Sequence, residues 1–285
     1  MLDSIKKRIG INPLAWLRDT WRMRNIVSGF DIQSSTHQQG LKFAVVVTPW
    51  IGSGVPWLSL GVGLLLARNA NQVTFVIDDL PFGRHPLRYR FVLRCIRVVA
   101  WSLRRRHHVI DLSGLPDDPS RAMLAKPTIT KLAHLNAVWE MRGETPSHAQ
   151  AEFAELCARQ LARAYGPIAD VLMPGEFDAV FVPGGVYGDS GLWVLHAKAA
   201  AVRIASFDNG GFGSLMLAVN GIACQMHDIP VAFRTLKTRC RDPHERSFAL
   251  ASARTELKNR RAGVDAFASQ IRDTESVGNT LTGRC

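Results

Sequence analysis

The residues best suited to chemistry lie in a glycine-rich segment at 182–191, Val-Pro-Gly-Gly-Val-Tyr-Gly-Asp-Ser-Gly. The segment follows a short apolar run and opens onto a predicted helix, whose free N–H groups can hold a phosphate or a carboxylate. Asp189 is a candidate catalytic carboxylate. The candidate substrate contacts in this loop are Gly184, Gly185, Tyr187 and Ser190. The alternative is a tight turn in which Asp189 or Ser190 only caps the helix.

A second glycine-rich segment, Asp-Asn-Gly-Gly-Phe-Gly at 208–213, follows the next predicted strand. Because it repeats the pattern at a neighbouring strand end, we expect the two loops to form a cleft. Asp208 is our first candidate for a catalytic base, and Asn209 and Gly210 are predicted substrate contacts. The alternative is a pair of unrelated turns.

Two earlier strand ends carry further candidates. Gly52, Ser53 and Gly54 form a Gly-x-Gly turn before an apolar helix, where a ligand can approach the backbone closely. This turn is neither GxGxxG nor a P-loop, so a dinucleotide or triphosphate site is poorly supported. Asp78 is a predicted substrate contact, and the adjacent Asp79 is a third candidate base. The alternatives are a turn that needs glycine for its geometry and an acid pair that caps the next segment.

Strands and helices must alternate to place these loops together. We predict strands at 43–48, 73–77, 108–112, 179–182 and 203–207, and helices at 56–68, 86–106, 129–142, 147–172, 190–201 and 243–272. This alternation predicts an α/β fold with a Rossmann-like, doubly wound parallel sheet, in which ligands bind beyond the carboxyl ends of the strands. The expected divisions are a basic helical segment and linker at 1–40, the sheet domain at 41–240, a C-terminal helix at 241–272 and a disordered tail at 273–285.

The formal charge of +11 suits an anionic partner. Predicted basic helices at 2–9 and 14–23 interleave tryptophan with arginine, as interfacial helices do. The predicted helix at 86–106 carries an arginine stripe opposite its apolar face, formed by Arg90, Arg94, Arg97 and Arg104. Contact with a membrane surface and solvated helix faces both remain open. Nucleic acid is the least favoured partner, because no stacking aromatics surround a basic groove.

Other classes of protein are not supported. The five cysteines are scattered without a CxxC pair, which favours a reducing compartment and argues against disulfides or zinc. No histidine spacing predicts a metal site. We recognise no signal peptide, and the longest near-apolar run, 55–67, is shorter than the ~20 residues of a membrane-spanning helix. A cytoplasmic protein is expected, and a peripheral position at the inner membrane face stays open as an alternative.

Three segments together resemble a known family. The segments 43–57, 73–79 and 182–213, in this order, are similar to the N-terminal half of bacterial capsular or surface polysaccharide glycosyltransferases of GT-B type. The resemblance implies an acceptor-binding domain that faces a second, donor-binding domain across a cleft. It also implies a nucleotide-sugar donor, no resident cofactor, a glycan or lipid-linked acceptor, and a carboxylate base among Asp208, Asp189 and Asp79.

The chain departs from the family where the donor half would follow. A further domain of roughly 150 residues is expected there. The resemblance therefore implies only the acceptor half of an enzyme, working with a separate donor-binding domain or chain. A non-catalytic binding module or a truncated remnant is the alternative.

Overall fold

A computed structural model describes residues 12–30, 40–50, 54–69, 71–83, 86–141, 147–211, 214–219, 222, 234, 237–238 and 242–261. By its internal contacts the chain divides into two units. The first comprises residues 1–207 and 218–224, and the second comprises residues 208–217 and 225–285. The predicted extension of the sheet domain to residue 240 remains a prediction.

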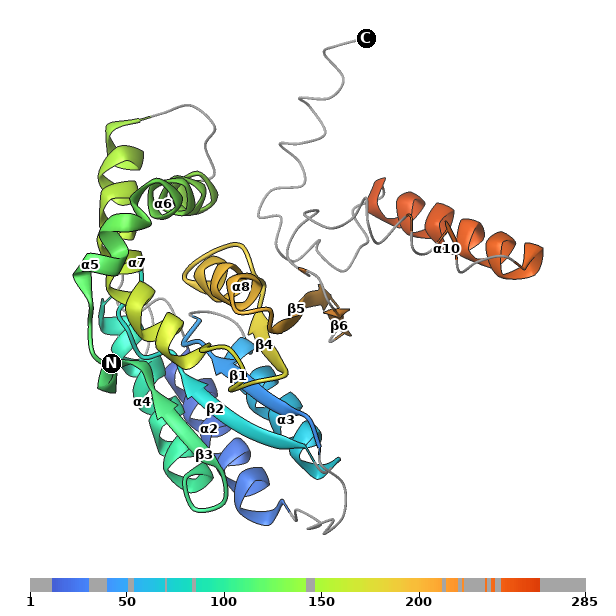
Figure 1. The fold of residues 1–285 in the computed structure, drawn as a ribbon. Helices are drawn as coiled ribbons and strands as arrows, with labels where there is room; N and C mark the ends of the chain where they lie inside the picture. Colours follow the sequence, from blue (N-terminus) through green and yellow to red (C-terminus); the bar gives the residue numbers. More distant parts are fainter. Residues whose placement is uncertain are drawn as a thin grey trace. The chain divides into compact units, whose positions relative to one another are not determined.

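The first unit is built on a central sheet (Figure 1). The first unit contains β1 (Lys42–Val47), β2 (Gln72–Ile77), β3 (His108–Asp111), β4 (Ala179–Pro183) and the start of β5 (Arg203–Gly211). The end of β5 and most of β6 (Ser214–Val219) belong to the second unit. The order is β3-β2-β1-β4-β5-β6, and the pairs β3–β2, β2–β1, β1–β4 and β4–β5 are parallel. This is the strand order of Rossmann-like sheets, with the topological switch between β1 and β4. The predicted mostly parallel α/β sheet is confirmed.

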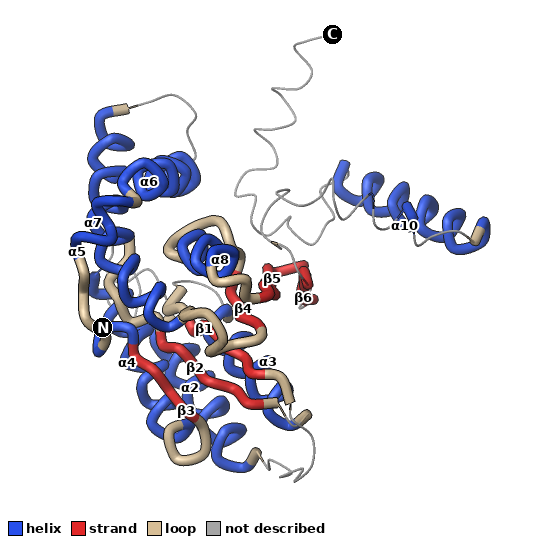
Figure 2. The backbone as a smooth tube through the Cα atoms, viewed as in Figure 1, coloured by secondary structure: helices blue, strands red, loops and turns tan. Residues whose placement is uncertain are grey.

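Helices cover both faces of the sheet (Figures 1 and 2). The helices before β3 are α2 (Pro13–Gly29), α3 (Val55–Arg68) and α4 (Pro86–Leu103). Those between β3 and β5 are the short η1 (Leu112–Gly114), α5 (Pro119–Leu124), α6 (Lys126–Met141), α7 (His148–Val171) and α8 (Ser190–Ala199). Alternate strand residues, such as Val46 and Val76, pack with α5–α8, so their neighbours Val45 and Phe75 face α3 and α4.

The core explains why two segments adopt their local structure. Residues 44–47 of β1 are almost completely buried, as a valine-rich strand covered on both faces requires. On α3, a Cβ atom at Gly63 would lie 2.3 Å from the ring of Phe75 on β2. Glycine therefore allows this helix to pack closely on the sheet.

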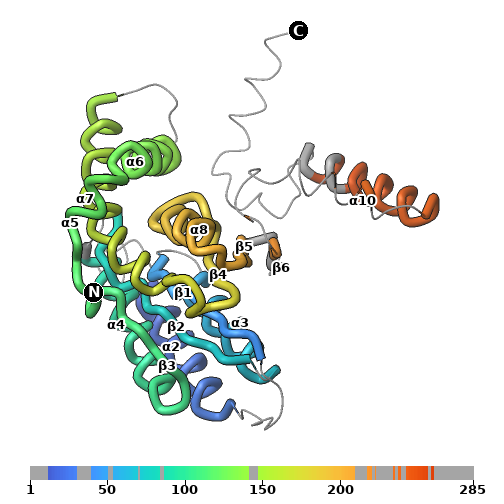
Figure 3. Tube along the Cα trace, in the orientation of Figure 1, coloured from blue at the N-terminus to red at the C-terminus, as the bar shows by residue number. Residues whose placement is uncertain are grey.

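Several boundaries differ from the prediction. Strand β5 continues through Gly211, so Asp208, Asn209 and Gly210 extend a strand where a loop was expected. The reason is that β6, which was not predicted, is hydrogen-bonded beside β5 and supplies ladder partners to this polar segment. The short helix α5 was also missed. Figure 3 shows the chain order by colour, ending in α10 (Pro243–Arg261) of the second unit. The predicted helix at 2–9 and tail at 273–285 lie outside the described residues.

Candidate functional site

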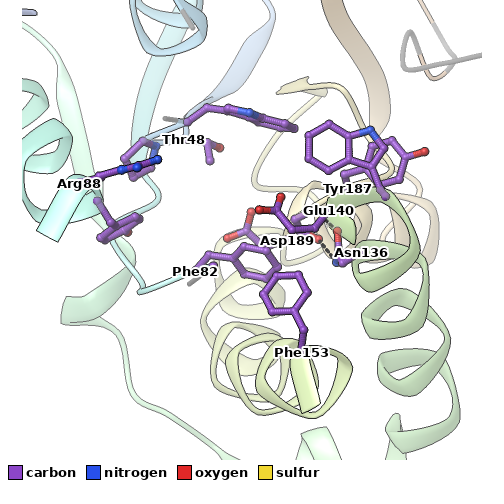
Figure 4. A pocket seen from close by; sticks show the side chains of 14 residues that line it. Thr48, Phe82, Arg88, Asn136, Glu140, Phe153, Tyr187 and Asp189 are labelled. Carbon is purple, nitrogen blue, oxygen red and sulfur yellow. Dashed lines mark hydrogen bonds between the residues drawn. The ribbon is translucent and has the colours of Figure 1, made fainter. Parts of the chain in front are cut away.

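A cavity of about 270 Å³ opens at the topological switch point (Figure 4). Its lining comes from the end of β1, the segment after β2, the start of α4, one side of α6, one residue of α7, and the loop between β4 and α8. Its lining residues are Thr48, Pro49, Trp50, Phe82, Gly83, Arg88, Tyr89, Asn136, Trp139, Glu140, Phe153, Tyr187, Gly188 and Asp189. This is the position at which open parallel sheets bind their ligands.

Two buried carboxyl groups meet beside this cavity. Asp78 follows β2 and is 1% exposed, and Asp189 precedes α8 and is 3% exposed. The two carboxyl groups are close enough for the charge of Asp189 to act on Asp78, although both carboxyl oxygens of Asp78 lack a hydrogen-bond partner among the described residues. Two buried carboxyl groups so placed disfavour a second negative charge, which favours one protonated and one ionised group.

The protonation of the pair follows from its surroundings. Burial raises the pKa of Asp78 well above its usual range, and the nearby Asp189 carboxyl raises it further. Burial also raises the pKa of Asp189. The indole of Trp193 acts in the opposite direction on Asp78, although its Nε1–H stops short of hydrogen-bond geometry. Because its pKa is raised more, Asp78 is the group of the two that more readily holds a proton.

Several buried polar atoms around the pair have no hydrogen-bond partner among the described residues. They are the hydroxyl oxygens of Thr48 and Ser190, the Trp193 Nε1 and both carboxyl oxygens of Asp78. Unsatisfied buried groups of this kind are rare in folded proteins and often mark a place for water or ligand. Their concentration at the ends of β1, β2 and β4 supports a binding site there.

One wall of the cavity is aromatic. The indole of Trp139 on α6 stacks on the ring of Tyr187, with centroids 4.9 Å apart and planes inclined by 29°. Trp50 meets the same indole edge-on, with a centroid distance of 6.1 Å. Flat aromatic faces beside carboxylate and amide groups provide both apolar contact and directional hydrogen bonds.

Helix α6 also fixes the loop that carries Asp189. The amide of Asn136 accepts a hydrogen bond from Gly188 N (2.6 Å) and donates one to Gly188 O (3.3 Å) (Figure 4). Gly188 has φ +64°, a conformation that favours glycine. This two-point contact holds the backbone immediately before Asp189 and so positions its carboxyl group.

Asp79 has a different environment from its neighbour Asp78. It accepts hydrogen bonds from Ser113 N (2.7 Å) and Ser113 Oγ (2.5 Å), and it forms an ion pair with Arg97 (2.8 Å). These contacts tie the end of β2 to η1 and α4. All of its bonds are structural, and it lines a groove beside α4 instead of the cavity that holds Asp189.

The structure brings some of the predicted site residues together at the cavity and leaves others apart from it. Asp78, Tyr187, Asp189 and Ser190 come together at or beside the cavity. Gly184 and Gly185, with φ +66° and +97°, shape the same loop, and Gly184 N donates to Phe207 O (2.7 Å). Gly54 precedes α3 as its N-terminal cap residue.

The remaining candidates are not assembled with them. Gly52 and Ser53 lie outside the described residues. Asp208, Asn209 and Gly210 belong to the second unit, whose placement relative to the cavity is undefined. The expected cleft between the two glycine-rich loops therefore remains a prediction.

The alternative that Asp189 merely caps α8 is not what the structure contains. Asp189 precedes the helix, but its side chain makes no capping hydrogen bond. The backbone carbonyl of Asp189 accepts instead from Leu192 N (2.8 Å) and Trp193 N (3.2 Å). The carboxyl group is free of that local role.

The contribution of α6 was missed from the sequence. Asn136, Trp139 and Glu140 lie one helical turn apart, on the side of α6 that faces the cavity. A buried asparagine followed at i+3 and i+4 by tryptophan and glutamate is the pattern that could have indicated this face. Arg88 on α4 adds a cation to the lining.

Comparison of the chain with protein-family models, curated proteins and solved structures returns no match. Among the described residues, no group of three or more His, Cys, Asp or Glu side chains is arranged to hold a metal ion. Within the same residues, no helix has the length and apolar character needed to cross a membrane.

Proposed function

We propose that this chain is the acceptor-binding domain of a glycosyltransferase of the GT-B type, acting in surface polysaccharide synthesis. The observation that carries the proposal is the Asp78–Asp189 pair, buried beside an aromatic-walled cavity at the switch point of a Rossmann-like sheet. A sugar offers hydroxyl groups to the carboxyl and amide groups and apolar C–H faces to the rings of Trp139 and Tyr187. The resemblance of three sequence segments to capsular polysaccharide glycosyltransferases supports the same assignment.

The cavity volume is consistent with a small part of a glycan. At about 270 Å³ it lies just below the range for small-molecule sites, about 300–1,000 Å³. One terminal sugar unit would therefore enter, while the rest of the acceptor extends outward. The open side of the cavity is where a donor-binding domain or chain would present its nucleotide-sugar.

In this proposal Asp189 acts as the general base. The acceptor hydroxyl oxygen attacks the anomeric carbon of the donor sugar, the bond from that carbon to the nucleotide diphosphate breaks, and the hydroxyl proton passes to the Asp189 carboxylate. A base with a raised pKa is better matched to this step at neutral pH than an ordinary aspartate. Asp78 is a positioning residue, because its charge acts on Asp189 and its raised pKa lets it hold the neighbouring proton.

A non-catalytic sugar-binding module is the second candidate. The low exposure of Asp189 favours this candidate. A catalytic base that must reach the hydroxyl group of a large acceptor would be expected to be more exposed. The two candidates share the cavity and differ in whether sugar transfer occurs once a donor-binding partner is supplied.

Binding tests the shared part of the proposal. The full chain is screened by thermal shift against mono- and oligosaccharides, free nucleotides and nucleotide-sugars, since a ligand of the folded state raises Tm. The site is supported if saccharides raise Tm and this effect is lost in Trp139→Leu. The effect should be kept in the control Trp101→Leu, which removes an exposed tryptophan outside the cavity. Stabilisation by nucleotides alone, or by no saccharide, contradicts it.

A further inference from the structure

The outer face of α2 and α4 combines exposed apolar side chains with arginines. On α2, Leu14, Leu17 and Trp21 are 56%, 52% and 60% exposed. Their spacing at i, i+3 and i+7 places them in one stripe along the helix. The buried side of the same helix, which includes Trp16 and Val27, packs on the domain. The exposed stripe is therefore an apolar surface that the fold of this unit leaves uncovered.

Helix α4 presents a matching stripe. Leu87, Val98 and Trp101 are exposed, and Arg90 and Arg94 lie on the same side of the helix by its periodicity. The guanidinium of Arg105, just beyond the helix, stands 4.2 Å from the centroid of the Trp101 ring. The opposite side of α4 is buried in the core, as its amphipathic pattern predicts.

The two helices lie side by side and run in the same direction. Thr20 meets Cys95, and Phe30 O accepts a hydrogen bond from Arg106 Nη1 (2.6 Å). Successive residues of a helix are rotated by about 100° around its axis. On α2 the exposed stripe therefore lies about a quarter-turn from Thr20, and on α4 it lies about a quarter-turn from Cys95. Because the helices are parallel and both bury their other side, the two stripes point outward together. We call this combined surface the α2–α4 face.

The charge of the α2–α4 face is strongly positive. Helix α4 contains no acidic residue, and α2 contains only Asp19, which pairs with Arg18 (3.0 Å) and Arg22 (3.9 Å). Within the described part of the chain, Arg90 and Arg94 form no ion pair. Arg24 stands 5.6 Å from the centroid of the Trp21 ring. Tryptophan with arginine around an apolar stripe is the composition of helices that lie in the headgroup region of a bilayer.

We infer that the α2–α4 face binds the surface of an anionic phospholipid bilayer. The apolar stripe enters the boundary between headgroups and acyl chains, and the arginines contact lipid phosphates. Each basic residue near such a surface contributes attraction that a neutral bilayer does not supply. This inference does not depend on the sugar site, since no residue of the stripe on α2 lines the cavity.

Vesicle binding tests the inference directly. The full chain is sedimented with vesicles of phosphatidylcholine alone and with vesicles that also contain phosphatidylglycerol. We expect binding to the anionic vesicles, and a loss of roughly tenfold or more in Arg90→Gln/Arg94→Gln. The matched control is Arg159→Gln/Arg163→Gln on α7, which removes the same charge at the same spacing from exposed positions and should leave binding unchanged.

The apolar part is tested in parallel. Leu17→Ser/Trp21→Ser should weaken binding by roughly tenfold or more, whereas Met123→Ser/Leu124→Ser, at exposed positions on α5, should not. In the unaltered protein, phosphatidylglycerol with brominated acyl chains should quench part of the tryptophan fluorescence. This measurement does not depend on whether any variant folds. The inference is overturned if the protein does not bind anionic vesicles, or if the control variants lose as much binding as the test variants. It is also overturned if the protein binds these vesicles without fluorescence quenching and duplex DNA competes for that binding.

Discussion

The carboxyl groups of Asp78 and Asp189 are both buried and close enough for the charge of one to act on the other, although one follows β2 and the other precedes α8. The strand between them in the sheet is β1, and Thr48 at its end lines the adjoining cavity. Burying two acids together is unfavourable unless a proton, a ligand or a partner compensates. Such an arrangement is more readily explained by function than by stability, and this view leads to the following predictions.

Asp78→Asn should stabilise the protein at neutral and alkaline pH. The folded-state pKa of Asp78 is raised, so the folded chain binds more protons than the unfolded chain above pH ~4, and stability falls as pH rises through that window. An asparagine amide at this position carries no charge, so it removes the free-energy cost of ionising a buried carboxyl group. Chemical denaturation at pH 5 and pH 8 should give a larger gain at pH 8. A loss of stability at both pH values would refute the description of Asp78 as a buried carboxyl group with a raised pKa.

Asp79→Asn should have the opposite effect. Asp79 accepts two hydrogen bonds from Ser113 and pairs with Arg97, and its carboxyl group is buried. Losing part of these contacts should destabilise the domain by about 1–3 kcal/mol, as for other buried hydrogen bonds to charged groups. The same denaturation assay compares the two neighbours directly. Equal effects of the two substitutions would mean that the environments of these carboxyl groups do not differ as described.

Two glycines of the β4–α8 loop should respond differently to alanine. At Gly188 the added Cβ would make only an ordinary contact, 4.0 Å from Phe82 Cε1, and the positive φ should destabilise by about 1 kcal/mol. At Gly191 the Cβ would lie 2.8 Å from Leu132 Cδ2 and 2.9 Å from Val186 O, so Gly191→Ala should be clearly worse. Thermal unfolding measures both, and the reverse order would show that the loop is packed differently.

Asn136→Leu should weaken saccharide binding more than it weakens the fold. The change removes both hydrogen bonds to Gly188 and frees the backbone before Asp189. We expect a loss of about 1–3 kcal/mol in stability from the unpaired Gly188 groups, with saccharide affinity reduced beyond what the unfolded fraction explains. Calorimetric titration well below Tm separates the two effects. Unchanged affinity would show that the clamp does not position the site.

The sequence predicted the parts of this site that follow strands. The glycine-rich segment 182–191 and the acid pair at 78–79 were both recognisable, because strand-end loops of a parallel sheet are the places where ligands bind. Which carboxyl groups meet was not predictable, since Asp78 and Asp79 differ only in the direction of their side chains. The strand β5 was predicted too short, because its pairing with β6 stabilises a polar segment that has no apolar alternation.

The wall contributed by α6 could not be anticipated for a related reason. Trp139 and Asn136 face the cavity because α6 packs on α7 and approaches the β4–α8 loop, and such tertiary contacts leave little trace in local sequence. Asp208, the first candidate base, was chosen from an expected adjacency of loops. Asp189 is now the better supported candidate, because it is next to both Asp78 and the cavity.

The most direct test is a ¹³C NMR titration of the aspartate carboxyl carbons, with and without an acceptor saccharide. We predict a carboxyl signal that titrates well above pH 4, disappears in Asp78→Asn, and shifts when the saccharide is added. The assignment of this pair to a sugar acceptor site would be contradicted if every carboxyl group titrated near its ordinary pKa. It would also be contradicted if the signal with the raised pKa did not shift with any saccharide that binds.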